Sequence, residues 1–344
     1  MYQIEQKNLP KSEVELTGEL PAEAFESAWQ EVARKESARA NIPGFRPGKI
    51  PEEMLVSRIG PHHLLQEAAE AALQKAYPEI IRERQLEVIG QPKVSITKLA
   101  RGNALGFKIV AAILPDVILP DYKTVAKEVF SKKEDVTVTD KDVADALEHL
   151  RASRRKKRED GVEDPLPELN DTFAKTVGNF TTLEELQQTV RDNLRFEKEL
   201  ARREELRTRA LASIADKTKM DIPQALADAE RDNMMAQLKS QLARIGLSWE
   251  QYLSQIKKNE EDLRREWEGE GEKRARYGLV LRALIKAEHI SPTDRELEDT
   301  ISEIRKQRGE KANVDEARIR EYAYSIITNE KVFKVLEGTA LSNT

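Results

Sequence analysis

The sequence predicts an α+β N-terminal domain followed by an elongated all-α domain with helical arms. Strand-like alternation is confined to residues 1 to about 112, whereas almost every segment beyond residue 165 has the 3.6-residue periodicity of a helix. Of the 344 residues, 35% are charged and only 5% are aromatic, which favours long, thin helical elements with modest cores. We therefore expect three regions: residues 1–112, a connector with a first arm helix at 113–164, and residues 165–344.

The N-terminal region has the alternating patterns of a sheet and the apolar spacing of covering helices. Its first expected helix begins at Pro21 and has apolar residues at helical spacing, among them Phe25 and Trp29. Further helices are expected at 52–59 and 62–84, and strands at 3–6, 13–19, 88–91, 94–99 and 105–113.

The segment Gly44–Pro51 predicts a rigid, exposed loop. Gly44 and Gly48 permit backbone angles closed to other residues, and Pro47 helps to stop regular structure from propagating. Phe45 at the tip has no core to enter, and Arg46 and Lys49 beside it can pair with phosphates or carboxylates. Six basic and three acidic residues between positions 34 and 58 give this stretch a net charge of +3 on a chain of net charge −5. By composition alone, the segment fits a docking loop and an ordinary Pro/Gly connection equally well.

The middle region predicts an extended connector from Pro115 to about Phe130, because two prolines and a Val/Lys alternation oppose a helix there. Thr139 then caps a helix that ends in the basic run Arg151–Arg158. That run could bind nucleic acid. We favour a solvated helix end, because the helix dipole favours cations there and no aromatic residues interleave to stack on bases.

The C-terminal region has repeated helix-start signals. Thr181 or Thr182 with Glu184 or Glu185 forms a capping-box pattern that opens a very long helix through about Ala215. Pro223 opens the next helix, which Gly246 ends. Later starts are expected at Ser248 with Gln251, near Asn259, at Thr293 with Glu296, and near Val314; Gly269–Gly271 predicts a kink or break.

Candidate catalytic groups are missing from the sequence, so we predict no catalytic residue, no metal site and no cofactor. There is no cysteine, and neither a Gly-x-Ser-x-Gly elbow nor a phosphate-binding Gly-x-x-x-x-Gly-Lys pattern occurs. The adjacent His62 and His63 do not share a helix face, so a solvated helix start is the favoured interpretation. The N-terminus lacks the apolar core of a signal peptide, and Ile109–Leu114 is far too short for a membrane span. We predict a cytoplasmic protein with no membrane contact.

The order of these features resembles the trigger factor family, the bacterial chaperones of nascent chains. The loop Gly44–Pro51 and the later helix containing Ala68–Leu73 resemble that family's ribosome-binding domain. Leu166–Asp171 is similar to the family's entry into its helical C-terminal domain, and Glu272–Ile290 and Thr293–Ile304 are similar to its later helices.

One departure from the family concerns the prolyl-isomerase domain of the FK506-binding type. Members usually carry it between the first arm helix and the segment that begins at Leu166. Here only Glu159–Pro165 occupies that place, far too little for a domain, which needs roughly 50 residues. Either a natural short form or excision of the domain explains the gap, and isomerase activity is not carried over.

The resemblance implies an ATP-independent chaperone that docks beside the ribosomal exit tunnel and shelters unfolded nascent chains. The loop residues expected to contact a ribosomal protein and adjacent ribosomal RNA are Gly44, Phe45, Arg46, Pro47, Gly48 and Lys49. Family members often have a basic residue where Pro47 stands. Candidate client-binding residues on the helical arms are Met234, Met235, Leu238, Leu242, Ile245, Trp249 and Tyr252, unless these pack the interior of their own arm. The alternatives are a prolyl isomerase with an unrecognised site and a helical scaffold without clients; a homodimer away from the ribosome is left open.

Overall fold

The computed structural model describes residues 3–40, 45–46, 48–131, 135–155, 165–308 and 315–341. The chain forms two compact units, each assembled from separate segments. Unit 1 comprises Met1–Ile118 and Lys219–Leu279, and unit 2 comprises Leu119–Thr218 and Val280–Thr344. Among the described helices, none combines the length and the apolar character that a membrane crossing needs.

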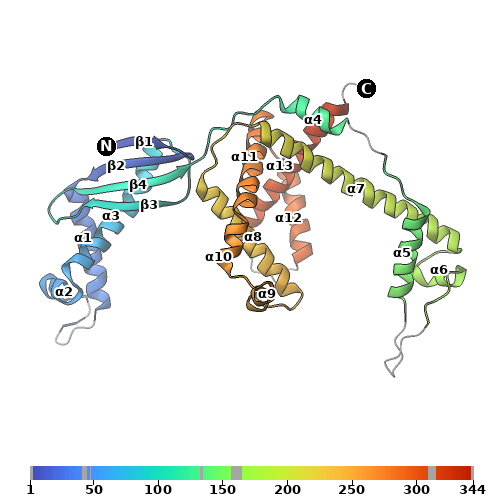
Figure 1. Ribbon diagram of the computed structural model, residues 1–344. Coiled ribbons are helices and arrows are strands. Elements are labelled where there is room, and N and C mark those ends of the chain that lie inside the picture. The colour runs from blue at the N-terminus through green and yellow to red at the C-terminus, as the bar shows by residue number, and fades with distance from the viewer. Residues whose placement is uncertain are drawn as a thin grey trace. The chain divides into compact units, whose positions relative to one another are not determined.

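Unit 1 begins with a four-stranded antiparallel sheet (Figure 1). The strands β1 (Gln3–Leu9), β2 (Glu13–Leu20), β3 (Val88–Lys98) and β4 (Leu105–Ile113) lie in the order β1-β2-β4-β3. In the central pair Leu16 lies opposite Ile109, and both side chains are fully buried. The predicted strands are confirmed, and the two segments expected near residues 88–99 join into the single strand β3, which contains register shifts.

Three helices complete the N-terminal part of unit 1: α1 (Ala22–Arg39), α2 (Glu52–Ile59) and α3 (Pro61–Glu83). Figure 1 shows α1 and α3 beneath the sheet. Phe25 and Trp29 of α1 and Leu64 and Ile80 of α3 are buried with Phe107 of the sheet in one core. The helical spacing of the apolar residues in α1 therefore covers one face of the sheet, as the sequence predicts.

The second segment of unit 1 is helical: α8 (Gln224–Arg244), α9 (Trp249–Ile256), α10 (Glu260–Glu266) and the first half of α11 (Glu268–Ala287). It is tied to the β1–β2 turn, where Ser12 Oγ donates to the carbonyl of Asp221 over 3.0 Å and the Lys11 amide donates to the Asp221 carboxylate. A side chain at Gly271 would place its Cβ 2.9 Å from the Ala227 carbonyl, so glycine allows α11 to approach α8 closely.

Unit 2 contains α4 (Tyr122–Phe130), α5 (Asp140–Ser153), α6 (Asp171–Val177), α7 (Leu183–Lys217), α12 (Asp294–Arg308) and α13 (Glu316–Leu341). One small core joins α5, α6 and the first half of α7 around Phe173 and Leu186. Another joins α12 and α13 around Ile304 and Ala323. The described part of unit 2 is therefore built around several small cores, as expected for a chain with few aromatic residues.

The extended connector expected through Phe130 is wrong in its second half, where residues 122–130 form α4. Asp121 caps this helix, because its side chain accepts from the Thr124 amide over 3.2 Å. Val125, Ala126 and Val129 form the buried face. The two prolines precede the helix, so they limit where it begins rather than preventing it.

The predicted helix starts are confirmed at each signal that the structure describes. Thr182 with Glu185, Ser248 with Gln251 and Asn259 with Asp262 form capping boxes, and Thr293 and Glu296 exchange the corresponding bonds. The kink or break expected at Gly269–Gly271 is wrong in position, because α11 continues through both glycines and the break lies at Trp267, between α10 and α11. Val314 and residues 156–164, which include the end of the basic run and most of the hinge, lie outside the described residues.

Candidate functional site

The loop between α1 and α2 presents its aromatic and cationic side chains to solvent. Phe45 is 37% exposed, and Arg46 and Lys49 are exposed. In the described part of the chain neither cation makes an ion pair, so both charges are free to meet a partner. The Lys49 amide donates to the Arg46 carbonyl over 3.0 Å, which closes a tight turn. Gly48 has φ +79°, the left-handed conformation that glycine adopts most easily, as the sequence predicts.

Ser37, near the end of α1, binds the part of the loop at residues 48–50 that leads to α2. The Ser37 carbonyl accepts from the Gly48 amide over 2.8 Å. The Ser37 hydroxyl accepts from the Ile50 amide over 3.3 Å. Ile50 itself is only 8% exposed and belongs to the N-terminal core. The loop is therefore connected to the core immediately after its last cation.

The start of α2, just past the loop, is fixed by a second cluster. Glu52 accepts from Trp29 Nε1 over 3.0 Å and pairs with Arg101 from the turn between β3 and β4. Arg101 also pairs with Glu26 over 2.9 Å, and its guanidinium lies 4.7 Å from the Trp29 ring centre. The hydrogen bonds to Glu26 and Glu52 raise the pKa of Arg101, and the bond from Arg101 lowers the pKa of Glu26. α1, α2 and the β3–β4 turn thus meet at the base of the loop.

Two of the six predicted ribosome-contact residues, Gly44 and Pro47, lie outside the described residues. The other four lie together at the loop. The sequence pattern predicts an exposed loop at these positions because glycine, proline and isolated cations have local meanings. It did not find Ser37, Trp29 or Arg101, because their contacts join positions far apart in the chain.

The candidate client-binding residues divide by burial. Met234, Met235 and Leu242 are buried, which fits the alternative that they pack within their own arm. Leu238, Trp249 and Tyr252 are half-buried, whereas Ile245 is 75% exposed at the end of α8. Ile245 is therefore the candidate that offers most apolar surface.

Trp249 and Tyr252 belong to an ordered cluster beside Ile245. Their rings stack with centroids 5.8 Å apart, and Lys239 Nζ lies 4.7 Å from the Trp249 ring centre. Trp249 Nε1 donates to Glu260 over 3.2 Å, and Lys239 pairs with the same carboxylate over 3.0 Å. These contacts hold the aromatic side chains in place while part of their surface stays accessible.

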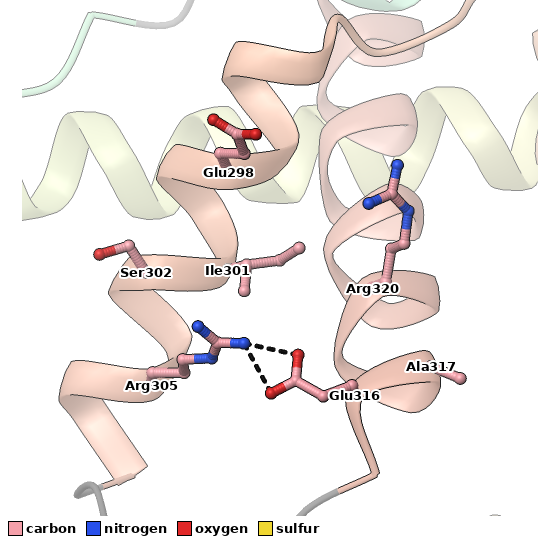
Figure 2. Close-up of a pocket in the computed structure, with 7 residues that line it drawn as sticks. All are labelled: Glu298, Ile301, Ser302, Arg305, Glu316, Ala317 and Arg320. Carbon is pink, nitrogen blue, oxygen red and sulfur yellow. Dashed lines mark hydrogen bonds and ion pairs between the residues drawn. The ribbon is translucent and has the colours of Figure 1, made fainter.

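A groove of about 420 Å³, which no sequence pattern predicts, lies between α12 and α13. Figure 2 shows Arg305 of α12 reaching across to Glu316 of α13, with Ile301 directed toward the space between the helices. The Arg305 Nη2 atom lies 2.6 Å and 2.5 Å from the two Glu316 oxygens. Further apolar side chains on α13 are exposed, namely Tyr322, Tyr324 and Ile326. These residues lie on both sides of the buried face of α13. The helical periodicity of the sequence therefore does not show which of its apolar residues are exposed.

Comparison with known proteins places nearly the whole chain in one family. Residues 2–150 match the family description "Bacterial trigger factor protein (TF)", and residues 182–337 match "Bacterial trigger factor protein (TF) C-terminus". The trigger factor of Caldicellulosiruptor bescii is 25% identical over 390 residues, covering 89% of this chain and 88% of the relative. The trigger factor of Bacillus licheniformis is 27% identical over 376 residues, covering 84% of this chain and 88% of the relative.

The fold has a counterpart among solved structures. A structure described as "Promiscuous Substrate Recognition in Folding and Assembly Activities of the Trigger Factor Chaperone" aligns with a TM-score of 0.58 and 19% identity. The alignment covers 98% of this chain and 99% of the other. This counterpart shares the arrangement of a four-stranded sheet domain followed by a helical region. The two family models place the chain in the class of ribosome-associated chaperones.

The chain belongs to the trigger factor family. It is an ATP-independent chaperone that acts at the ribosome and binds nascent chains. Only the N- and C-terminal family domains are matched, and residues 151–181 lie between the two matches. The alignment with the Caldicellulosiruptor relative has 390 positions and includes 89% of the 344 residues here, which is about 306, so about 84 of its positions (390 − 306) have no counterpart in this chain. The chain is thus short for the family, consistent with the absence of the isomerase domain.

Proposed function

We propose that the chain docks beside the ribosomal exit tunnel through Gly44–Pro51, with residues 1–112 as the ribosome-binding domain and residues 165–344 as the chaperone domain. The observation that supports this most directly is the loop itself. Phe45, Arg46 and Lys49 are exposed, and the Gly48 and Ile50 amides donate to Ser37, which fixes the backbone on both sides of Lys49. A surface that is shaped before binding loses less conformational entropy when it docks.

The chemistry of the loop suits a mixed protein and RNA partner. Arg46 can donate two parallel hydrogen bonds to a phosphate, and Lys49 can approach another phosphate as a compact charge. Phe45 supplies apolar area for a ribosomal protein at the exit tunnel. The site therefore combines a salt-dependent contribution from the two cations with a salt-independent contribution from the ring.

We further propose that clients bind weakly and reversibly on the exposed apolar residues of the helical arms. Ile245 and the accessible surfaces of Leu238, Trp249 and Tyr252 are the first candidates. Charged residues surround them, so contacts stay small and separate. Such dispersed contacts favour binding to many unfolded sequences over tight binding to one.

We propose that the chain shelters its clients in the cytoplasm without catalysing their isomerisation. The family matches fall on the N- and C-terminal domains alone, which supports this proposal. Assay of a proline-containing peptide with the purified chain should give the uncatalysed isomerisation rate. A rate that rises in proportion to chain concentration would restore the enzyme hypothesis.

The docking proposal is tested by ribosome co-sedimentation across a salt series. The variant Phe45→Ala/Arg46→Ala/Lys49→Ala should lose co-sedimentation while its circular dichroism stays unchanged. A matched control, Lys7→Ala/Lys93→Ala, removes two exposed cations from the sheet and should bind like the parent chain. Loss of two phosphate contacts should reduce the slope of log K against log salt by roughly 1 to 2. Unchanged sedimentation of the triple variant would overturn the assignment.

A further inference from the structure

We infer that Ser37 is a positioning residue for ribosome docking: its carbonyl and hydroxyl together set the direction in which the loop presents Lys49. This inference rests on the proposed docking function of the loop and extends it to a residue that does not itself touch the partner. Ser37 lies near the end of α1 and is 7% exposed, so it is one of the few buried polar side chains among the described residues.

The position of Ser37 explains why both of its oxygens are available. The last four carbonyl groups of a helix have no partner within the helix, and α1 ends at Arg39. The Ser37 carbonyl is one of these groups, and it accepts from the Gly48 amide at 2.8 Å. The hydroxyl, buried in the same place, accepts from the Ile50 amide at 3.3 Å. One residue therefore supplies both acceptors to the returning chain.

Three consecutive amides of the loop donate hydrogen bonds, two of them to Ser37. Gly48 and Ile50 donate to Ser37, and Lys49 between them donates to the Arg46 carbonyl at 3.0 Å. Ile50 is buried in the core, whereas Lys49 is exposed. The two bonds to Ser37 thus fix the backbone on both sides of Lys49 while its side chain faces solvent. The bond from Lys49 to Arg46 extends this order to the second cation.

Removal of the hydroxyl would leave the Ile50 amide without its acceptor beside the core. A single intramolecular hydrogen bond contributes on the order of 1 kcal/mol, which corresponds to roughly a fivefold change in an equilibrium. Because only the ordered loop docks, the apparent dissociation constant rises as the ordered fraction falls, at most by that same factor. The loop keeps both cations, so the number of phosphate contacts does not change.

The test compares Ser37→Thr with Ser37→Val, which have nearly the same shape and differ by the hydroxyl group. Each is measured by ribosome co-sedimentation over a salt series and by hydrogen exchange of the Ile50 amide. Ser27→Ala, an exposed serine on the same helix, is the matched control. We expect Ser37→Val to bind more weakly than Ser37→Thr, by up to roughly fivefold, with an unchanged salt slope and faster exchange at Ile50.

The outcomes separate this inference from the docking proposal. Equal affinity of Ser37→Thr and Ser37→Val, with the Phe45/Arg46/Lys49 triple variant inactive, would overturn the positioning role and leave docking intact. Continued binding by the triple variant would overturn both. A reduced salt slope for Ser37→Val would also count against positioning, because it would show that a phosphate contact had been lost.

Discussion

Arg207 of α7 and Glu330 of α13 form a forked ion pair, with Nη1 to Oε2 at 2.8 Å and Nη2 to Oε1 at 3.0 Å. The Arg207 side chain is only 7% exposed, and it also reaches Glu337 over 2.6 Å. Its guanidinium lies 5.2 Å from the ring centre of Phe333. Burial disfavours the charge, but the bonds to the two carboxylates outweigh it and raise the pKa of Arg207. This cluster joins α7 to the C-terminal helix of unit 2.

Replacing Arg207 by Ala should destabilise unit 2 by about 3 kcal/mol, because Glu337 and Glu330 would lose the cation that compensates their partial burial. The matched control is Arg209→Ala, which removes a 46% exposed cation from the same helix and should cost less than about 1 kcal/mol. Hydrogen exchange of α7 and α13 amides is the suitable measurement, because a chain of two units need not unfold in one step. Equal protection in the two variants would contradict the prediction.

Acid should loosen the same cluster. The hydrogen bond from Arg207 lowers the pKa of Glu330 below 4.5. Burial raises the pKa of Glu337, but the bonds from Arg203 and Arg207 outweigh it, so this pKa also lies below 4.5. Carboxyl groups with depressed pKa values stabilise the fold above the unfolded pKa and lose that contribution as pH falls through the folded pKa. Exchange protection of α13 should therefore be constant from pH 6 to about 5 and decline below about 4.5.

The acid response is assigned to this cluster with a variant. Glu330→Gln/Glu337→Gln removes both titrations, so its protection should be lower at pH 6 and should change less between pH 5 and pH 3.5. An identical acid response in the parent chain and this variant would place the sensitivity elsewhere in unit 2.

A substitution at Gly48 tests the backbone of the docking loop separately from its charges. Gly48→Ala should lower ribosome affinity by up to roughly fivefold, because alanine is disfavoured by roughly 1 kcal/mol at its φ of +79° and nothing lies near enough to clash. The control is Gly102→Ala in the β3–β4 turn, where φ is +77° and the surroundings are equally open. Both variants should lose similar stability in urea, but only Gly48→Ala should sediment less with ribosomes. A parallel loss of binding in Gly102→Ala would show that stability alone governs docking.

The exposed end of α8 provides the test of client binding. Ile245→Asp should weaken the suppression of aggregation of a denatured client, because a charge replaces the most exposed apolar candidate. Ala243→Asp places the same charge at an exposed position two residues earlier and should behave like the parent chain. Light scattering at several molar ratios of chaperone to client gives the comparison. Equal suppression by the two variants would remove Ile245 from the client surface.

Local chemistry explains why much of the fold could be predicted. Capping boxes such as Thr182 with Glu185 join residues only three positions apart, so the sequence pattern predicts the contact directly. Alternation likewise predicted a strand at residues 13–19, which lies within β2. The extended connector predicted through Phe130 is wrong for residues 122–130, because the two prolines oppose a helix locally whereas the Asp121 and Thr124 cap that follows them begins one.

Contacts distant in sequence explain what could not be predicted. Nothing near Ser37 indicates that its hydroxyl meets Ile50 across a loop, because that bond depends on how α1 is placed against the core. Met235 has the residue type of a flexible client-binding group, yet it is 3% exposed. Its burial is a tertiary property that composition does not contain. Residue type thus indicated the chemistry of the sites, while tertiary packing decided which side chains are accessible.

The discontinuous units have a consequence for the synthesis of this protein. The N-terminal core extends from Val14 to Ala111, so it can close when only the first third of the chain has been translated. The contact between Arg207 and Glu330 joins residues 123 positions apart, and it must wait for the last helix. Domains generally fold in order during translation. The N-terminal core is therefore complete while α4 and α7 still lack α13. During that interval, a chaperone of nascent chains is itself an unfinished nascent chain.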